Sequence, residues 1–166
     1  MDKRQRLVLA ILGGILAAAL ILLAVLLLTR SPDSIISDFH APPFEENALV
    51  GVPKDILERA DYRQVDVEGN YTFSICGAPE HKDGQLLPYF ASHGNNEVWL
   101  LLKVYDINGT ELGTSGLLRP GECVKGITLK TAPVGGSVKV KILSYEPETY
   151  FSRGSASATL SLAPSP

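Results

Sequence analysis

The sequence predicts an all-β domain, an antiparallel sandwich, that follows a single N-terminal transmembrane helix and a stalk. Three observations support this expectation: one uncharged run near the N-terminus, a period-two alternation over most of the remaining chain, and no long helical pattern between the alternating runs. We expect a cytoplasmic tip at residues 1–6, a membrane helix at 7–28, a stalk at 29–64, a sandwich at 65–162 and a short tail at 163–166.

Residues 7–28 form an apolar run without a charged side chain. At about 1.5 Å per residue, a helix of this length crosses a hydrocarbon core of about 30 Å. Lys3, Arg4 and Arg6 precede the run and Arg30 alone follows it, so the positive-inside rule predicts a single-pass plasma-membrane protein with a cytoplasmic N-terminus and an extracellular domain. A cleaved signal peptide is the alternative. No small-x-small cleavage pattern follows the run, and we therefore favour an uncleaved signal anchor.

The remainder of the chain is mildly acidic. From Thr29 onward, 12 Lys/Arg stand against 17 Asp/Glu, which gives a net charge of −5. Such a charge repels nucleic-acid backbones, so no nucleic-acid partner is expected.

Residues 29–64 contain four prolines and no clear periodicity, which indicates a stalk. Within it, residues 53–60 predict one short helix, since they begin with proline followed by an acidic residue.

From residue 65 onward, apolar and polar side chains alternate in short runs. The alternating runs lie at 65–75, 98–105, 123–129, 138–142 and 156–162. The run at 98–105 is apolar on both faces, which is typical of a central strand. Turn residues separate the runs and no helix of useful length intervenes. This pattern of about six or seven short strands predicts an immunoglobulin-like antiparallel sandwich.

One hairpin has a strong local signal. Asn108 and Gly109 lie between two β-rich runs, and this dipeptide favours a two-residue turn with positive φ at both central positions. Asp106 precedes them and resembles the start of a calcium loop, but the loop length and the terminal glutamate are missing. We therefore predict that Asp106 serves the turn through local backbone hydrogen bonds.

The order of predicted strands and turns at residues 97–106, 116–122 and 144–150 carries a resemblance to a known group of proteins. In these segments the chain resembles small uncharacterised membrane-anchored proteins of Gram-positive bacteria with one extracytoplasmic β-sandwich domain. The resemblance implies a cell-envelope location and a non-enzymatic role.

Cys76 and Cys123 are the only cysteines. An even number of cysteines in an oxidising compartment favours a disulfide. Against it, Cys76 lies off the apolar face of its predicted strand, so the disulfide remains open. Two cysteines without a histidine at ligand spacing do not make a metal site. We expect no metal and no cofactor.

The segment around Pro147 combines carboxylates with aromatic side chains. The candidate binding residues are Trp99, Tyr145, Glu146, Glu148, Tyr150 and Phe151. Two carboxylates flanked by aromatic rings suit sugar binding, or the acid and base pair of a glycosidase. A solvated turn explains the same pattern and is the interpretation we favour, so no catalytic residue is predicted.

Two functions follow from these observations. The first is a non-enzymatic interaction or scaffolding module of the cell envelope that docks another envelope protein through loops or a sheet edge. The alternative is a carbohydrate-binding or glycoside-acting domain on wall polymers, using Trp99, Tyr105 or the loop at 145–151. The first requires an exposed strand edge or an apolar patch. The second requires a concave aromatic platform with convergent polar groups. We favour the first.

Overall fold

The computed structural model describes residues 2, 4, 40–68 and 70–164. The predicted membrane helix at 7–28 and the stalk up to residue 39 lie outside these residues. Among the described residues, no helix is long and apolar enough to cross a membrane. The chain divides into two compact units between His40 and Ala41, and the fold described below is that of the second.

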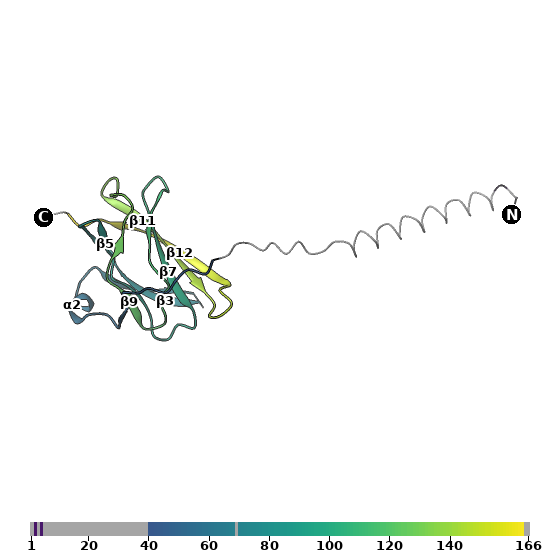
Figure 1. The fold of residues 1–166 in the computed structure, drawn as a ribbon, viewed down its shortest axis with the longest axis horizontal. Coiled ribbons are helices and arrows are strands. Elements are labelled where there is room, and N and C mark those ends of the chain that lie inside the picture. Colours follow the sequence, from purple (N-terminus) through teal and green to yellow (C-terminus); the bar gives the residue numbers. More distant parts are fainter. Residues whose placement is uncertain (1, 3, 5–39, 69, 165–166) are drawn as a thin grey trace. The chain divides into compact units, whose positions relative to one another are not determined.

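The second unit consists mainly of antiparallel strands, as predicted. The five-stranded sheet has the order β1 (Leu49–Val50), β9 (Glu122–Val124), β6 (Phe90–Ser92), β3 (Tyr71–Cys76) and β2 (Tyr62–Val67). The four-stranded sheet has the order β12 (Ser152–Ser161), β11 (Ser137–Tyr145), β7 (Trp99–Tyr105) and β8 (Glu111–Thr114). A smaller sheet has the order β10 (Ile127–Thr128), β5 (Gln85–Leu87) and β4 (Glu80–Lys82). In the view of Figure 1, β3 and β9 lie below β11 and β12.

The two larger sheets share one hydrophobic core. In β3 the buried Phe73 alternates with half-buried Thr72 and Ser74, and in β11 the buried Val140 alternates with exposed lysines. The rings of Phe73 and Phe90 lie 6.0 Å apart between their centroids. Each large side chain buried in this way contributes about 1.5–3 kcal/mol relative to exposure. The period-two pattern therefore identified the core faces of these strands correctly.

The outer face of the five-stranded sheet is covered by the chain itself. Strands β1 and β2 form opposite edges of this sheet, so the connection at 51–61 has to reach from one edge to the other. We call residues 51–61 the covering segment. It contains the short helix α2 (Lys54–Leu57), which begins after Pro53 and lies on the outside of the unit (Figure 1). The side chain of Ile56 is only 4% exposed although it lies outside the main core, which places it against the sheet. The helix predicted at 53–60 exists, but it is shorter.

The folded unit begins before the predicted boundary at residue 65. Phe44 forms a parallel bridge with Leu117, and the Glu45 amide donates to the Leu117 carbonyl at 3.0 Å. The Gly116 amide donates to Glu45 Oε2 at 2.7 Å, and a Cβ atom on Gly116 would clash with the backbone of Phe44 and Glu45. Because this segment is held by single contacts rather than by an alternating strand, its sequence carries no periodic signal.

The hairpin between β7 and β8 forms as predicted, with a different turn. Asp106 Oδ1 accepts hydrogen bonds from the backbone amides of Asn108 at 2.9 Å and Thr110 at 2.7 Å. The Gly109 amide donates to the Asp106 carbonyl at 3.2 Å, and Gly109 has a φ of +91°. Asn108 is not among the residues with positive φ. The prediction of two positive φ angles was therefore wrong, since the Asp106 side chain closes a longer turn that needs only one.

Candidate functional site

Strand β12 forms a long unpaired edge of the four-stranded sheet. It has ten residues and pairs only with β11, whereas the opposite edge strand β8 has four residues. The edges of the five-stranded sheet, β1 and β2, have two and six residues. A free edge presents backbone amides and carbonyls that can pair with an added strand. Length alone therefore distinguishes β12 from the other edges of the two larger sheets.

The composition of β12 also leaves its edge open. Folded proteins usually protect an edge with charged side chains, with proline, or by covering it. Strand β2 carries Arg63 and Asp66, and at β8 the Leu112 carbonyl accepts a hydrogen bond from the Lys130 amide at 2.7 Å. Arg153 is the single charged residue of β12, which otherwise contains small and uncharged side chains with one leucine, and no proline.

The two faces of β12 differ in chemistry. Ala156, Ala158 and Leu160 lie opposite core residues of β11 and face inward. Leu160 is buried, whereas Ala158 is exposed. Serine and threonine side chains occupy the outward positions. The inward row therefore ends in an opening at the side of the sandwich.

This opening is a groove of about 400 Å³ between β12 and the β2 side of the other sheet. Val65, Ile75 and Leu160 supply apolar walls, and Val65 remains 39% exposed. Arg63 lines the same groove, and no ion pair of Arg63 is found among the described residues. The groove thus offers apolar contacts together with one uncompensated cation.

One end of the groove is held by a carboxylate. Asp61 accepts two hydrogen bonds from the Arg59 guanidinium, at 2.9 and 3.1 Å, and one from the Ala78 amide at 3.1 Å. The Asp61 carbonyl accepts a further bond from the Gly77 amide at 2.7 Å. The Arg59 hydrogen bonds lower the pKa of the Asp61 carboxyl below its ordinary value. Asp61 therefore fixes the end of the covering segment to the turn that follows β3.

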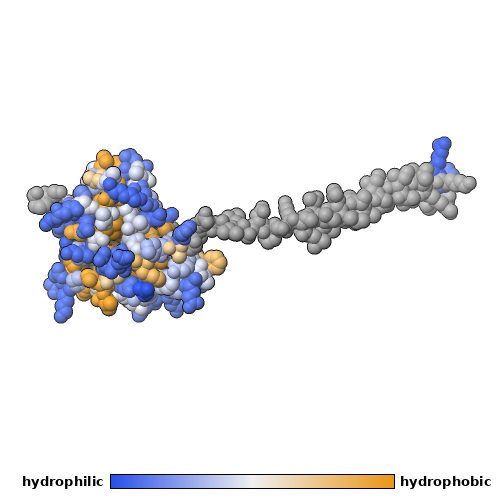
Figure 2. All heavy atoms as spheres, viewed as in Figure 1, coloured by the Kyte–Doolittle hydropathy of each residue, from blue (hydrophilic) through white to orange (hydrophobic). Residues whose placement is uncertain are grey.

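The surface offers no broad hydrophobic alternative on the side viewed in Figure 2. Hydrophobic residues form several separate patches among hydrophilic ones there. Scattered apolar side chains of this kind are ordinary for a folded domain.

The aromatic residues predicted as a binding platform pack against one another. The Trp99 ring makes edge-to-face contacts with Phe44, at 4.8 Å between centroids, and with Tyr150, at 5.3 Å. Arg119 covers the Phe44 ring, with its Cζ atom 3.7 Å from the centroid. Tyr145 lies opposite Trp99 in the sheet. The indole therefore joins the entering chain to the loop between β11 and β12, and its ring is engaged in that contact.

The loop at 146–151 closes on itself. The Glu146 amide donates to the Phe151 carbonyl at 2.9 Å, and Thr149 Oγ1 donates to Glu146 Oε2 at 3.0 Å. Glu148 and Tyr150 both have positive φ, at 65° and 56°, a conformation that costs such residues about 1–3 kcal/mol each. The Phe151 side chain is 70% exposed. The Glu146 carboxylate thus takes part in a turn, which is the interpretation favoured from the sequence.

The candidate disulfide is not formed, and both cysteines are free and buried. Cys76 lies on β3 and Cys123 on β9, with β6 between them. Strands lie about 4.8 Å apart, so the two Cα atoms are separated by roughly 10 Å or more, beyond the 7 Å limit for a disulfide. Both residues alternate with core positions and lie under the covering segment. Burial raises the pKa of each thiol to about 11.

The chain matches no known protein-family model, no curated protein sequence and no solved structure. Within the described part of the chain, no group of three or more His, Cys, Asp or Glu side chains is placed to hold a metal ion. The groove and the open edge were not identified from the sequence. The uncharged serine and alanine alternation of β12 was the available signal, but alternation does not reveal which strand lies at an edge.

Proposed function

We propose that the protein is a membrane-tethered, non-enzymatic interaction module of the cell envelope that docks an extended segment of a partner protein onto strand β12. One observation carries this proposal: β12 is a ten-residue edge that pairs on one side only and bears a single charge. Strand addition to such an edge provides affinity through main-chain hydrogen bonds that do not depend on the partner's sequence.

Specificity would come from the groove beside the edge. In an added strand, every second side chain points to the same face. Those side chains would enter the groove between Val65 and Leu160, where small or medium aliphatic groups fit. An acidic residue on the partner would complement Arg63. We therefore propose an extended partner segment with alternating aliphatic residues and one carboxylate.

The location is part of the same proposal. The uncharged run at 7–28 and the basic residues before it support a membrane anchor with the folded unit outside the membrane. The five-stranded and four-stranded antiparallel sheets around one core support an immunoglobulin-like variant of the sandwich.

The carbohydrate alternative has less support. Sugar-binding platforms present an accessible aromatic face with polar groups around it. Trp99 is half-buried between Phe44 and Tyr150, and the Glu146 carboxylate is bonded within its own loop. Of the residues expected to form the platform, Trp99, Tyr150 and Glu146 are therefore committed to internal contacts.

The test compares two substitutions on the same strand. Ala158→Lys places a charge on the inward face of β12, two positions before Leu160, which lines the groove, whereas Ser155→Lys places it on the opposite, outward face. The full chain with either change would be expressed in its native cells, and the proteins recovered with it from solubilised membranes would be identified and quantified. We expect Ala158→Lys to lose a partner that Ser155→Lys and the unchanged chain retain. Equal recovery of every protein by all three chains would contradict docking at β12.

A further inference from the structure

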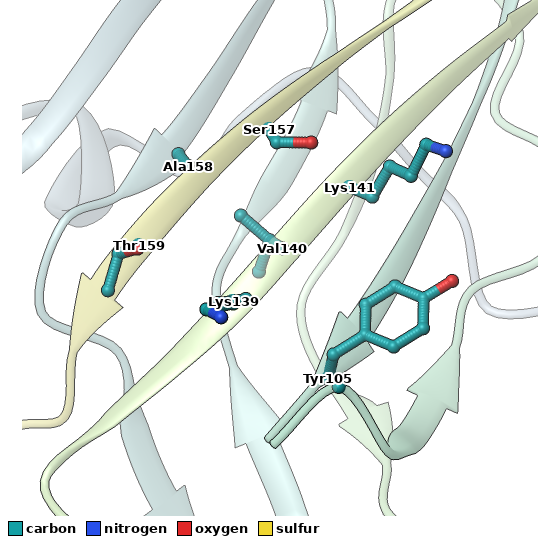
Figure 3. A pocket seen from close by; sticks show the side chains of 8 residues that line it. Tyr105, Lys139, Val140, Lys141, Ser157, Ala158 and Thr159 are labelled. Atoms are coloured by element: carbon teal, nitrogen blue, oxygen red, sulfur yellow. The ribbon is translucent and has the colours of Figure 1, made fainter. Parts of the chain in front are cut away.

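A second surface lies on the outward face of the four-stranded sheet, on the other side of β12 from the groove. A cavity of about 330 Å³ is lined there by Tyr105, Lys139, Lys141, Ser157 and Thr159. In the sheet, Lys139 is flanked by Tyr105 and Thr159, and Lys141 lies opposite Ser157. Figure 3 shows the two lysines on β11, between Tyr105 on one side and the hydroxyl residues of β12 on the other. The polar side chains of this cavity come from three adjacent strands, β7, β11 and β12.

The two lysines carry uncompensated charge. No acidic partner of either is found among the described residues, and Lys139 Nζ donates only to the Ile107 carbonyl, at 3.2 Å. Lys103, which lies opposite Lys141, is by contrast paired with Glu111 at 2.9 Å. The folded unit is acidic as a whole, so two adjacent unpaired lysines form a local exception. Like charges so close together favour an anion between them.

The donors suit one class of anion. Lys139 and Lys141 are two positions apart on one strand, so their side chains start about 7 Å apart and can converge on one group. Carboxylates are best matched by the planar fork of arginine, and no arginine lines this cavity. A phosphate group offers several acceptor oxygens and a charge near −2, which fits two ammonium groups with nearby hydroxyls.

We propose that this cavity binds the phosphate group of a phosphate monoester, such as glycerol phosphate. Lys139 and Lys141 neutralise its charge, and Ser157 and Thr159 donate hydrogen bonds to its oxygens. Tyr105 borders the space next to the phosphate and packs against the body of the ligand. Thr159 lines both this cavity and the groove, whereas Lys139 and Lys141 line only the cavity, so variants of the two lysines test phosphate binding independently of strand docking.

The experiment uses the full chain reconstituted in phosphatidylcholine nanodiscs and titrated calorimetrically with glycerol phosphate at constant ionic strength. We expect binding that inorganic phosphate competes and acetate does not. The Lys139→Gln/Lys141→Gln chain should lose at least about tenfold in affinity, since each removed charged hydrogen bond contributes strongly. Lys82→Gln is the matched control, because Lys82 is an exposed lysine on a different sheet.

Two further measurements define the chemistry of the ligand. Affinity should rise between about pH 5 and pH 7.5, because the phosphate monoester loses its second proton near pH 6. In nanodiscs that contain phosphatidylglycerol, a lipid phosphate that occupies the site would weaken the apparent binding of glycerol phosphate. Equal affinity of the double variant and the unchanged chain, equal competition by acetate, or an equal loss in Lys82→Gln would overturn the proposal.

Discussion

The two large sheets share a core but differ on their outer faces. The five-stranded sheet is covered by residues 51–61, which bury their own Ile56 side chain together with Cys76 and Cys123 of the sheet. The four-stranded sheet leaves lysines and hydroxyl groups of β11 and β12 exposed, and its edge is unpaired. The chain thus covers one sheet with its own segment and leaves the outer face of the other exposed. Changes on the covered face should alter stability, and changes on the open face should alter binding.

The largest effect is expected at the centre of the covering segment. Ile56→Ala removes the buried side chain that holds α2 on the sheet and should lower the free energy of unfolding by about 2–4 kcal/mol. The thiols beneath it should also become accessible. Denaturant unfolding measures the first effect, and the rate of thiol alkylation near pH 8 measures the second.

Leu57→Ala provides the control within the same helix. Its side chain is 59% exposed, so its truncation should change stability by less than about 0.5 kcal/mol. In the unchanged chain, the cysteines should react slowly, because burial raises the pKa of both thiols to about 11. Fast alkylation of the unchanged chain, or equal effects of both substitutions, would show that the segment does not cover the sheet.

An intermediate effect is expected where the covering segment ends. Asp61→Asn keeps the shape of the side chain but removes the charge that holds Arg59, and should cost about 1–3 kcal/mol. Arg59 lowers the pKa of Asp61 in the folded state, so protonation favours unfolding. The contribution is therefore complete above the unfolded value of about 3.9 and is lost as the pH falls through the folded value.

The measurement is the free energy of unfolding from pH 7 to pH 2. The unchanged chain should lose stability at acidic pH more steeply than Asp61→Asn does. Asp55→Asn, on exposed α2, is the control and should follow the unchanged chain. Parallel curves for the unchanged chain and Asp61→Asn would show that this carboxylate does not anchor the segment.

A smaller effect is expected at the hairpin of the open sheet. Gly109 has a φ of +91° with no neighbouring atom within 4 Å of an added Cβ, so the cost of substitution is conformational. Gly109→Val should lower stability by about 1–2 kcal/mol, because a β-branched residue resists positive φ. Gly94→Val tests the same substitution at a glycine with equal space but without positive φ. Thermal melting of both chains should show the loss only at Gly109.

The smallest effect on stability is expected on the open face itself. Lys141 is exposed and has no ion pair within the described residues, so Lys141→Gln should change the free energy of unfolding by less than about 0.5 kcal/mol. Lys103→Gln breaks the pair with Glu111 and gives a comparison on the same face. A large loss of stability in Lys141→Gln would mean that this lysine has a structural role.

The strands of the core could be predicted because their signal is periodic. Residues such as Phe73 and Val140 alternate with polar neighbours, and their burial follows from that alternation. The hairpin at Gly109 was also predicted, since asparagine followed by glycine favours tight turns. Its type was not, because the Asp106 side chain competes for the turn amides in a way that the dipeptide does not encode.

The covering segment and the open edge could not be predicted for a different reason. Phe44 and Ile56 are isolated apolar residues rather than members of an alternating row, so they produce no pattern along the chain. Strand order is likewise set by pairings between distant segments, so nothing local marks β12 as an edge. The sequence singled out Trp99 and Tyr150 as candidate binding residues, but it did not reveal that their rings pack on one another.

The most direct test of docking at β12 is site-specific photo-crosslinking of the full chain in native membranes. A photoreactive residue would be placed in turn at Ala156 and Ala158 on the inward row, and at Lys82 as a control. The account predicts cross-links from the inward row to alternate residues of one extended segment of a single partner protein, and none to that segment from Lys82. Cross-links from β12 only to a second copy of this chain, or to many proteins without a common segment, would contradict it.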